Sequence, residues 1–228
     1  MPEIAVAINC MDADCAENKI RHILSFLPKD GWLHLDAADG RFTFNKSWQD
    51  PSLMQRLIGD SNLEVHIMAE EPELSMEMWL AAGAKRIVLH LESFFKTTRR
   101  ECPTDPFHAL NQLRLHCEER RAKLVLAINA ETPVRDLEPY LAKFSDFQIF
   151  SQAHPGPAGQ PFLATVLPKI KWLREKSPRA IIEVDGGMVP ETVRQVCEAG
   201  ANWIISGSYI LNSSDPLRSY LELKNIKV

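Results

Sequence analysis

The chain has 228 residues, of which 45% are hydrophobic and 25% are charged, and its formal net charge is −4. This length and composition suit a globular protein with a substantial apolar core. The small negative charge and the absence of any block of like charges exclude a general electrostatic attraction to nucleic acid or to an anionic membrane surface.

Short apolar runs alternate with longer amphipathic segments along the whole chain. The runs are rich in Ile, Val and Leu and predict strands, whereas apolar residues spaced three and four apart predict helices. Two predicted helices end at Gly83 and Gly200. Glycine is common at helix C-termini, which supports these boundaries. In chain order, the predicted strands cover residues 4–9, 32–37, 63–69, 86–93, 123–130, 146–153, 180–186 and 202–208, and the clearest helical patterns cover residues 73–83, 134–144, 162–176 and 190–200.

Repeated strand–helix units imply a parallel sheet. Eight such units in a chain of this length favour a closed (β/α)8 barrel, the TIM barrel, over an open doubly wound sheet. No low-complexity tract or linker divides the sequence, so residues 1–228 are predicted to form a single domain.

The cysteines and the apolar runs bear on the cellular compartment. The five cysteines are odd in number and lack CxxC spacing, which favours reduced thiols over a disulfide framework or a zinc site. The apolar runs are too short to span a bilayer, and the first ten residues, "MPEIAVAINC", do not resemble a signal peptide. A cytoplasmic protein without a membrane partner is therefore expected. The cysteines are Cys10, Cys15, Cys102, Cys117 and Cys197.

Polar side chains recur at the C-terminal ends of the predicted strands. In "GWLHLDAADGRF" (31–42), His34 and Asp36 share one face of a strand whose other face is apolar. His66 and Asp185 lie near the ends of two further strands, at the face of a barrel where active sites gather. An isolated strand histidine is more often a hydrogen-bonded core residue, but this recurrence favours a divalent metal site. Zn, Fe(II), Mn and Co all accept mixed nitrogen and oxygen ligands.

Glycine-containing loops follow the last three predicted strands: "HPGPAGQPF" (154–162), "VDGGMVPET" (184–192) and "ISGS" (205–208). Glycine lets backbone N–H groups approach an anion closely, and the loops after strands seven and eight form a recurrent phosphate site in such barrels. A single glycine pair is more often a tight turn. Three glycine-containing loops after three consecutive strands predict a phosphate site.

Several motifs in order resemble the ribulose-phosphate 3-epimerase family over nearly the whole chain. The family's His-x-Asp and Asp-Gly-x-Phe pattern is similar to "HLDAADGRF", and its Val-His-Leu-Met is similar to "VHIM". Its later motifs resemble "HLE" (90–92), "PGPAGQPF" (155–162) with Lys169–Ile170 after it, "VDGG" (184–187) and the Gly207–Ser208 pair. The resemblance implies a TIM barrel of the ribulose-phosphate-binding type.

The resemblance further implies an isomerase that epimerises a small ketose phosphate at C3, with ribulose 5-phosphate and xylulose 5-phosphate as the first candidates. It implies one divalent metal ion (Zn, Fe(II), Mn or Co) and a homo-oligomer, a dimer or larger. Asp36 and Asp185 would transfer protons on opposite faces through an enediolate. The metal ligands would be His34, Asp36, His66 and Asp185, and the substrate and phosphate contacts would be His66, Gly156, Pro157, Ala158, Gly159, Gly186, Gly187, Gly207 and Ser208.

Some positions depart from the family pattern. Val6–Ala7 stands where the family has Pro-Ser, so Ala7, the nearby Asn9 and the retained Met68 are further candidate site residues. Ala38 and Ser151 stand where the family has methionine, and Pro157 replaces a phenylalanine. These changes replace apolar groups that exclude water with small or polar ones.

Two alternatives follow from these departures, and a third comes from the shared barrel architecture. The first is an epimerase for another ketose phosphate such as allulose 6-phosphate, since "CMD" (10–12) and "GQPF" (159–162) resemble that branch. The second is a diverged barrel that binds a sugar phosphate with little or no turnover. The third is a barrel decarboxylase, which is disfavoured because "DAADG" (36–40) lacks the lysine of the Asp-x-Lys-x-x-Asp signature. Retention of all four candidate metal ligands favours catalysis.

Overall fold

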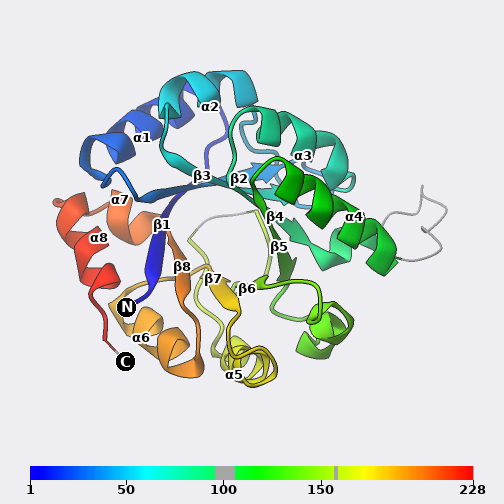
Figure 1. Cartoon of the computed structure of the whole chain (residues 1–228). Helices are drawn as coiled ribbons and strands as arrows, with labels where there is room; N and C mark the ends of the chain where they lie inside the picture. The colour runs from blue at the N-terminus through cyan, green and yellow to red at the C-terminus, as the bar shows by residue number, and fades with distance from the viewer. Residues whose placement is uncertain (96–105, 157–158, 228) are drawn as a thin grey trace.

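Eight parallel strands close into a barrel in the computed structural model, which describes residues 1–95, 106–156 and 159–227 (Figure 1). Each strand pairs with its neighbours in sequence, and β8 pairs with β1. The predicted (β/α)8 barrel is confirmed. The strands are β1 (Glu3–Ile8), β2 (Trp32–Ala38), β3 (Asn62–Met68), β4 (Arg86–His90), β5 (Lys123–Ile128), β6 (Asp146–Phe150), β7 (Ile181–Asp185) and β8 (Trp203–Ser206).

Helices surround the barrel and cover the outer face of the sheet (Figure 1). Several begin at favourable caps: the side chain of Asp12 accepts a hydrogen bond from the backbone N–H of Cys15 (2.8 Å), and Asp50 caps the next helix in the same way. The α-helices are α1 (Ala13–Phe26), α2 (Pro51–Ile58), α3 (Pro72–Ala81), α4 (Pro106–Glu119), α5 (Leu167–Lys176), α6 (Pro190–Ala199), α7 (Ser208–Leu211) and α8 (Pro216–Lys224).

The apolar core lies mainly between the sheet and its helices. On β2, for example, Leu33 and Leu35 are buried in this core together with Ile20 and Ile23 of α1. Burying one such aliphatic side chain stabilises the fold by about 1.5–3 kcal/mol. The alternate residues of β2, including His34, point to the barrel interior instead, so strand alternation itself delivers polar groups to the barrel axis.

The segment at 134–144, predicted as a helix, forms the short 3-10 helix η2 (Val134–Tyr140). Pro139 lies inside it, and proline has no N–H with which to continue an α-helical ladder. The fourth predicted strand is also shorter than expected. It ends at His90, and Leu91–Phe94 form the 3-10 helix η1. A third 3-10 helix, η3 (Ala164–Val166), precedes α5.

The prediction that the cysteines are all reduced is wrong for one pair. Cys10, just after β1, and Cys15, in the first turn of α1, form a disulfide across a Cα–Cα distance of 5.8 Å. The tight connection between β1 and α1 brings the two residues within bonding reach. Cys117 and Cys197 are free and buried, and Cys102 lies outside the described residues. Among the described helices, none has the length and apolar character needed to cross a bilayer.

Candidate functional site

Four predicted ligands converge at the C-terminal end of the barrel. His34 and Asp36 come from β2, His66 from β3 and Asp185 from β7. One nitrogen or carboxylate oxygen from each residue lies within 4.8 Å of the corresponding atoms of the others. Asp36 and His66 are register partners on adjacent strands, whereas β7 reaches the same point from across β8 and β1.

The spacing of these atoms suits a shared cation. His34 Nε2 lies 3.4 Å from Asp36 Oδ1 and 3.9 Å from Asp185 Oδ2, and His66 Nδ1 lies 3.4 and 3.5 Å from the same two oxygens. Ligand atoms about 2.1 Å from a tetrahedral ion stand roughly 3.4 Å apart. Among the described residues, neither His34 Nε2 nor either nitrogen of His66 has a hydrogen-bond partner, although all three are buried. Buried nitrogens that lack partners beside two carboxylates fit a metal centre.

The cluster perturbs the protonation of its own members. Burial would raise the pKa of Asp36, but the His34 and His66 rings outweigh it and hold that pKa well below its usual range. Burial would lower the pKa of His34 and of His66, yet the neighbouring carboxylates raise both. Asp36 is therefore ionised at neutral pH. A cation would displace protons from the rings, since only a neutral imidazole ligates.

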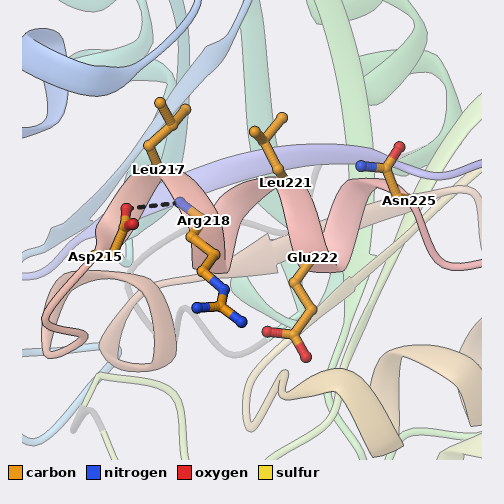
Figure 2. Close-up of a pocket in the computed structure, with 6 residues that line it drawn as sticks. All are labelled: Asp215, Leu217, Arg218, Leu221, Glu222 and Asn225. Atoms are coloured by element: carbon orange, nitrogen blue, oxygen red, sulfur yellow. Dashed lines mark hydrogen bonds between the residues drawn. The ribbon is translucent and has the colours of Figure 1, made fainter.

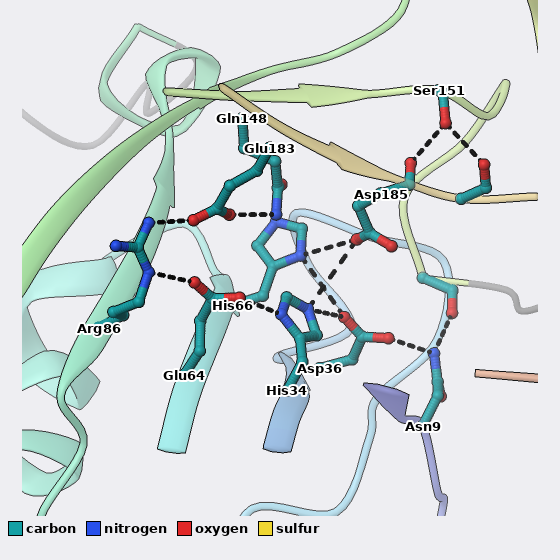
Figure 3. A network of polar contacts seen from close by, with 12 residues as sticks. Asn9, His34, Asp36, Glu64, His66, Arg86, Gln148, Ser151, Glu183 and Asp185 are labelled. Atoms are coloured by element: carbon teal, nitrogen blue, oxygen red, sulfur yellow. Dashed lines mark hydrogen bonds and ion pairs between the residues drawn. The ribbon is translucent and has the colours of Figure 1, made fainter. Parts of the chain in front are cut away.

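A second polar network adjoins the four ligands on the side of the N-terminal ends of the strands, at the left in Figure 3. His34 Nδ1 is 2.7 Å from Glu64 Oε1, and Arg86 Nε donates to Glu64 Oε2 at 2.7 Å. The guanidinium also contacts Asp146 and Glu183. Burial would raise the pKa of Glu64, but the hydrogen bond with His34 and the charge of Arg86 lower it to about 2. An ionised Glu64 makes His34 Nδ1 the proton donor, which leaves Nε2 as the ligand atom.

His90 lies beside the cluster without joining it. Its ring stacks on His66 at a centroid distance of 4.8 Å, and Phe42 and Phe150 pack against it. Burial lowers the pKa of His90 and so favours the neutral ring. Glu92 Oε2 lies 3.3 Å from His90 Nδ1, and Glu92 Oε1 accepts from the backbone N–H of Asn129, which connects η1 to the segment after β5.

A cavity of about 680 Å³ opens above the four ligands. Asp36 and Asp185 line it, whereas His34 and His66 lie buried beneath. The other predicted site residues in its wall are Ala7, Asn9, Met68, Gly156, Gly159, Gly186, Gly187, Gly207 and Ser208. Pro157 and Ala158 lie outside the described residues.

The loop after β7 needs glycine at two successive positions. Gly186 and Gly187 have φ values of 111° and 69°, the left-handed region in which other residues are strained. A Cβ at Gly186 would lie 2.5 Å from Gln152 Cγ, and one at Gly187 would lie 2.8 Å from the backbone nitrogen of Phe162. The loop therefore presents bare backbone to the cavity.

Comparison with known proteins places this chain in a family. The sequence profile described as the Ribulose-phosphate 3 epimerase family matches residues 3–211. The chain belongs to the ribulose-phosphate 3-epimerase family. It is 34% identical to the ribulose-phosphate 3-epimerase of Synechocystis sp., over 86% of this chain and 82% of that protein. It is 32% identical to the Bacillus subtilis ribulose-phosphate 3-epimerase, over 98% of this chain and 100% of that protein.

Family membership confirms the prediction of an enzyme of the isomerase class that acts on sugar phosphates. A solved structure with the same fold is that of KGPDC from Streptococcus mutans. Its TM-score is 0.66 at 13% identity, and the match covers 99% of this chain and 96% of that one. At this identity the likeness concerns the fold alone.

Two departures from the epimerase family pattern have structural counterparts. Ser151, where the family has methionine, places its hydroxyl 2.7 Å from the carbonyl oxygens of both Asp185 and Gly186, and so joins β6 to the β7 loop. Asn9 donates from Nδ2 to Asp36 Oδ2 (3.1 Å) and to the carbonyl oxygen of Gly156 (2.8 Å). Ser151 and Asn9 thus make polar contacts around the site.

Sequence reasoning missed several residues around the site. Glu64 stands two residues before His66 on the same strand face, and that spacing is a signal that could have found it. Nothing in the sequence singled out Arg86 or Gln148, whose partners Glu64 and Glu183 lie beside them on the neighbouring strand through the register of the barrel. Lys19 of α1 also lines the cavity and donates from Nζ to the carbonyl oxygen of Asn9 (3.2 Å).

A second hollow, of about 590 Å³, lies along α8 on the outside of the barrel (Figure 2). Asp215 caps this helix by accepting from the backbone N–H of Arg218 at 3.0 Å. This hollow includes none of the four clustered ligands. Its lining residues are Asp215, Leu217, Arg218, Leu221, Glu222 and Asn225.

Proposed function

We propose that the protein is a metal-dependent 3-epimerase of a ketose phosphate, with the ribulose 5-phosphate and xylulose 5-phosphate pair as its substrates. The observation that carries the proposal is the pairing of Asp36 and Asp185. These carboxylates line one cavity, come from strands separated by β8 and β1, and meet the same two histidines. Two carboxylates so placed suit removal of a proton from one face of a carbon and delivery to the other.

His34, Asp36, His66 and Asp185 would hold one divalent ion, and their donor set is compatible with Zn, Fe(II), Mn or Co. When bound, the ion supplies Lewis-acid stabilisation of the negative charge that develops on the substrate oxygens. Asp36, which the histidines keep ionised, would accept the C3 proton on one face, and Asp185 would donate a proton on the other. The reverse reaction exchanges their roles.

The substrate phosphate would bind to the backbone of three loops at the far side of the cavity. Gly156 and Gly159, Gly186 and Gly187, and the Gly207–Ser208 pair all line this space. Backbone N–H groups exposed by glycine are suited to an anion. Binding energy from this remote group would hold C3 between Asp36 and Asp185.

Deuterium exchange tests the proposal directly. Protein purified without chelators is incubated in D2O with ribulose 5-phosphate, and deuterium at C3 is followed by NMR together with formation of xylulose 5-phosphate. The expected result is incorporation coupled to inversion. A panel containing allulose 6-phosphate identifies an epimerase for another sugar. Saturable binding without exchange for any ketose phosphate, with metal supplied, would establish a binding protein and overturn the proposal.

We further propose that residues 1–228 form one domain, since the strands and helices of the barrel run from Glu3 to Lys224. A homo-oligomer and a cytoplasmic location stay predictions. Light scattering coupled to gel filtration measures the first, and cell fractionation measures the second.

A further inference from the structure

A guanidinium group is buried inside the barrel, one layer below the four clustered ligands (Figure 3). Arg86 is the first residue of β4 and is only 5% exposed. Its Cζ lies 4.2 Å from the ring centroid of Trp203 and 6.0 Å from that of Trp32. A buried charge is costly unless it is fully paired, so the partners of Arg86 account for its presence.

Each arm of the guanidinium donates to a different carboxylate. Nε donates to Glu64 Oε2 and Nη1 to Asp146 Oδ1, both at 2.7 Å, and Nη2 donates to Glu183. These acids come from β3, β6 and β7, so closure of the barrel is required to bring them together. The planar fork of arginine fits three separate acceptors, whereas a lysine ammonium offers one point charge.

Glu64 connects this guanidinium to the metal centre. Its second oxygen lies 2.7 Å from His34 Nδ1. The other two acids make no contact with the four ligands: Asp146 Oδ2 accepts from Ser145 (2.5 Å), Glu183 Oε2 accepts from Gln148 (3.4 Å), and the Glu183 side chain also meets Glu64 itself. Of the three acids paired with Arg86, Glu64 is thus the one that passes the contact on to the four-ligand cluster.

We propose that Arg86 is a positioning residue for the metal centre, because it holds Glu64 in the orientation that fixes the His34 ring and leaves Nε2 free to ligate. The role rests on the metal site proposed above. Carboxylates that orient a ligating histidine commonly change metal affinity 10–100-fold when they are altered. Arg86 would act one residue further from the metal, by holding the carboxylate that orients the histidine.

Two variants probe the connection. Arg86→Lys keeps a positive charge but loses the fork, so Glu64 is no longer held through Nε. Glu64→Gln keeps nearly the same volume but replaces the charged acceptor by an amide, so it remains informative if Arg86→Lys fails to fold. Asp146→Asn is the matched control, because it disturbs Arg86 on the side away from His34.

The experiment uses chelator-treated full-length protein titrated with Co(II), with affinity and ligand geometry read from visible absorption. Thermal midpoints of the metal-free forms are measured in parallel. We expect Co(II) affinity to fall by about 10-fold or more in Arg86→Lys and Glu64→Gln, with altered absorption bands. We expect Asp146→Asn to bind Co(II) within about twofold of wild type, whatever its thermal midpoint.

Three outcomes contradict the proposal, and they are distinguishable. Wild-type affinity and spectrum in a folded Arg86→Lys or Glu64→Gln variant would show that Arg86 does not act on His34 through Glu64. An equal loss in Asp146→Asn would assign the effect to general loosening of the barrel interior. A wild-type protein that binds no Co(II) would contradict the metal centre itself, and the role of Arg86 with it.

Discussion

Asp36 and Asp185 face one cavity from different strands, so removal of each carboxylate should have a different consequence. We expect Asp36→Asn and Asp185→Asn each to lower epimerisation by about 10²–10⁴-fold, because one of the two proton transfers is lost. In D2O, the remaining carboxylate should exchange the C3 proton on its own face without inversion. Each variant should therefore label a different epimer, and NMR of both epimers measures this.

Metal content of the two variants serves as the control, since both residues are proposed ligands. Labelling of the same epimer by both variants would show that the two carboxylates act on one face. That outcome would contradict their assignment as an acid and base pair.

The imidazole of His34 is predicted to be needed for metal retention. His34→Ala removes one of two nitrogen ligands, so the metal content of protein purified without chelators should fall from about one per chain to below roughly a tenth. Elemental analysis by mass spectrometry measures it. His116→Ala is a suitable control, because His116 pairs with Glu77 away from the cluster. Retention of metal in His34→Ala would contradict the proposed ligand set.

The four clustered residues could be predicted from the sequence, whereas Arg86 could not. His34 and Asp36 interrupt one apolar strand at alternate positions and His66 interrupts the next, and such interruptions are visible in the sequence alone. Arg86 begins its strand, where a charged residue normally indicates the solvent-exposed flank. Its burial depends on acids from three other strands, and that proximity exists only in the closed barrel.

Among the elements, Glu92 of η1 links the end of β4 to the segment after β5. Its Oε1 accepts from the backbone N–H of Asn129 (2.8 Å) and from the Thr132 hydroxyl, and its Oε2 faces His90 Nδ1. Lys169 of α5 also donates to the carbonyl oxygens of Ala130 and Thr132. Burial would raise the pKa of Glu92, but His90 and the hydrogen bonds from Thr132 and Asn129 lower it to about 2, from 4.5.

This lowered pKa predicts an acid-dependent contribution to stability. The ionised Glu92 stabilises the folded state above pH 4.5, and the contribution is lost as the pH falls towards 2. We expect Glu92→Gln to lower the free energy of unfolding by about 1–3 kcal/mol at pH 7, with the difference shrinking below pH 4.5. Urea unfolding of both proteins from pH 7 to pH 3 measures this, and a difference independent of pH would contradict it.

The strands followed the sequence pattern closely, but local features of single elements did not. The apolar spacing at 134–144 indicated a helix, whereas Pro139 restricts the segment to a 3-10 helix. Cys10 and Cys15 were expected to be reduced because no CxxC spacing was present. Their disulfide depends on the tight path from β1 into α1, a property of the backbone and not of the spacing alone.

For the whole molecule, the four ligands come from β2, β3 and β7, so one ion would connect distant strands of the barrel. Metal at about 100 times its dissociation constant should stabilise the folded state by about 2.7 kcal/mol. For a chain of this size, that corresponds to a thermal midpoint about 5–10 °C higher. Scanning calorimetry with and without chelator measures the shift. The midpoint of His34→Ala should not respond to chelator, and an equal response would place the stabilising metal elsewhere.

The order of strands and helices predicted barrel closure, because eight strand–helix units leave few other arrangements. What the order could not predict is the chemistry of the barrel interior. Glu64, Arg86, Gln148 and Glu183 occupy positions that apolar side chains fill in many such barrels. Their contacts depend on strand register, which places Glu64 beside Arg86 and Gln148 beside Glu183.

The indole rings of Trp32 and Trp203 contact each other edge to face at 5.0 Å, and both lie near the Arg86 guanidinium. Ultraviolet emission from tryptophan is sensitive to nearby charge and packing. The intrinsic fluorescence of Trp32 and Trp203 should therefore report on the region next to the ion-binding residues. Loading with a closed-shell ion such as zinc should change this emission in the unlabelled protein, which also contains Trp48, Trp79 and Trp172.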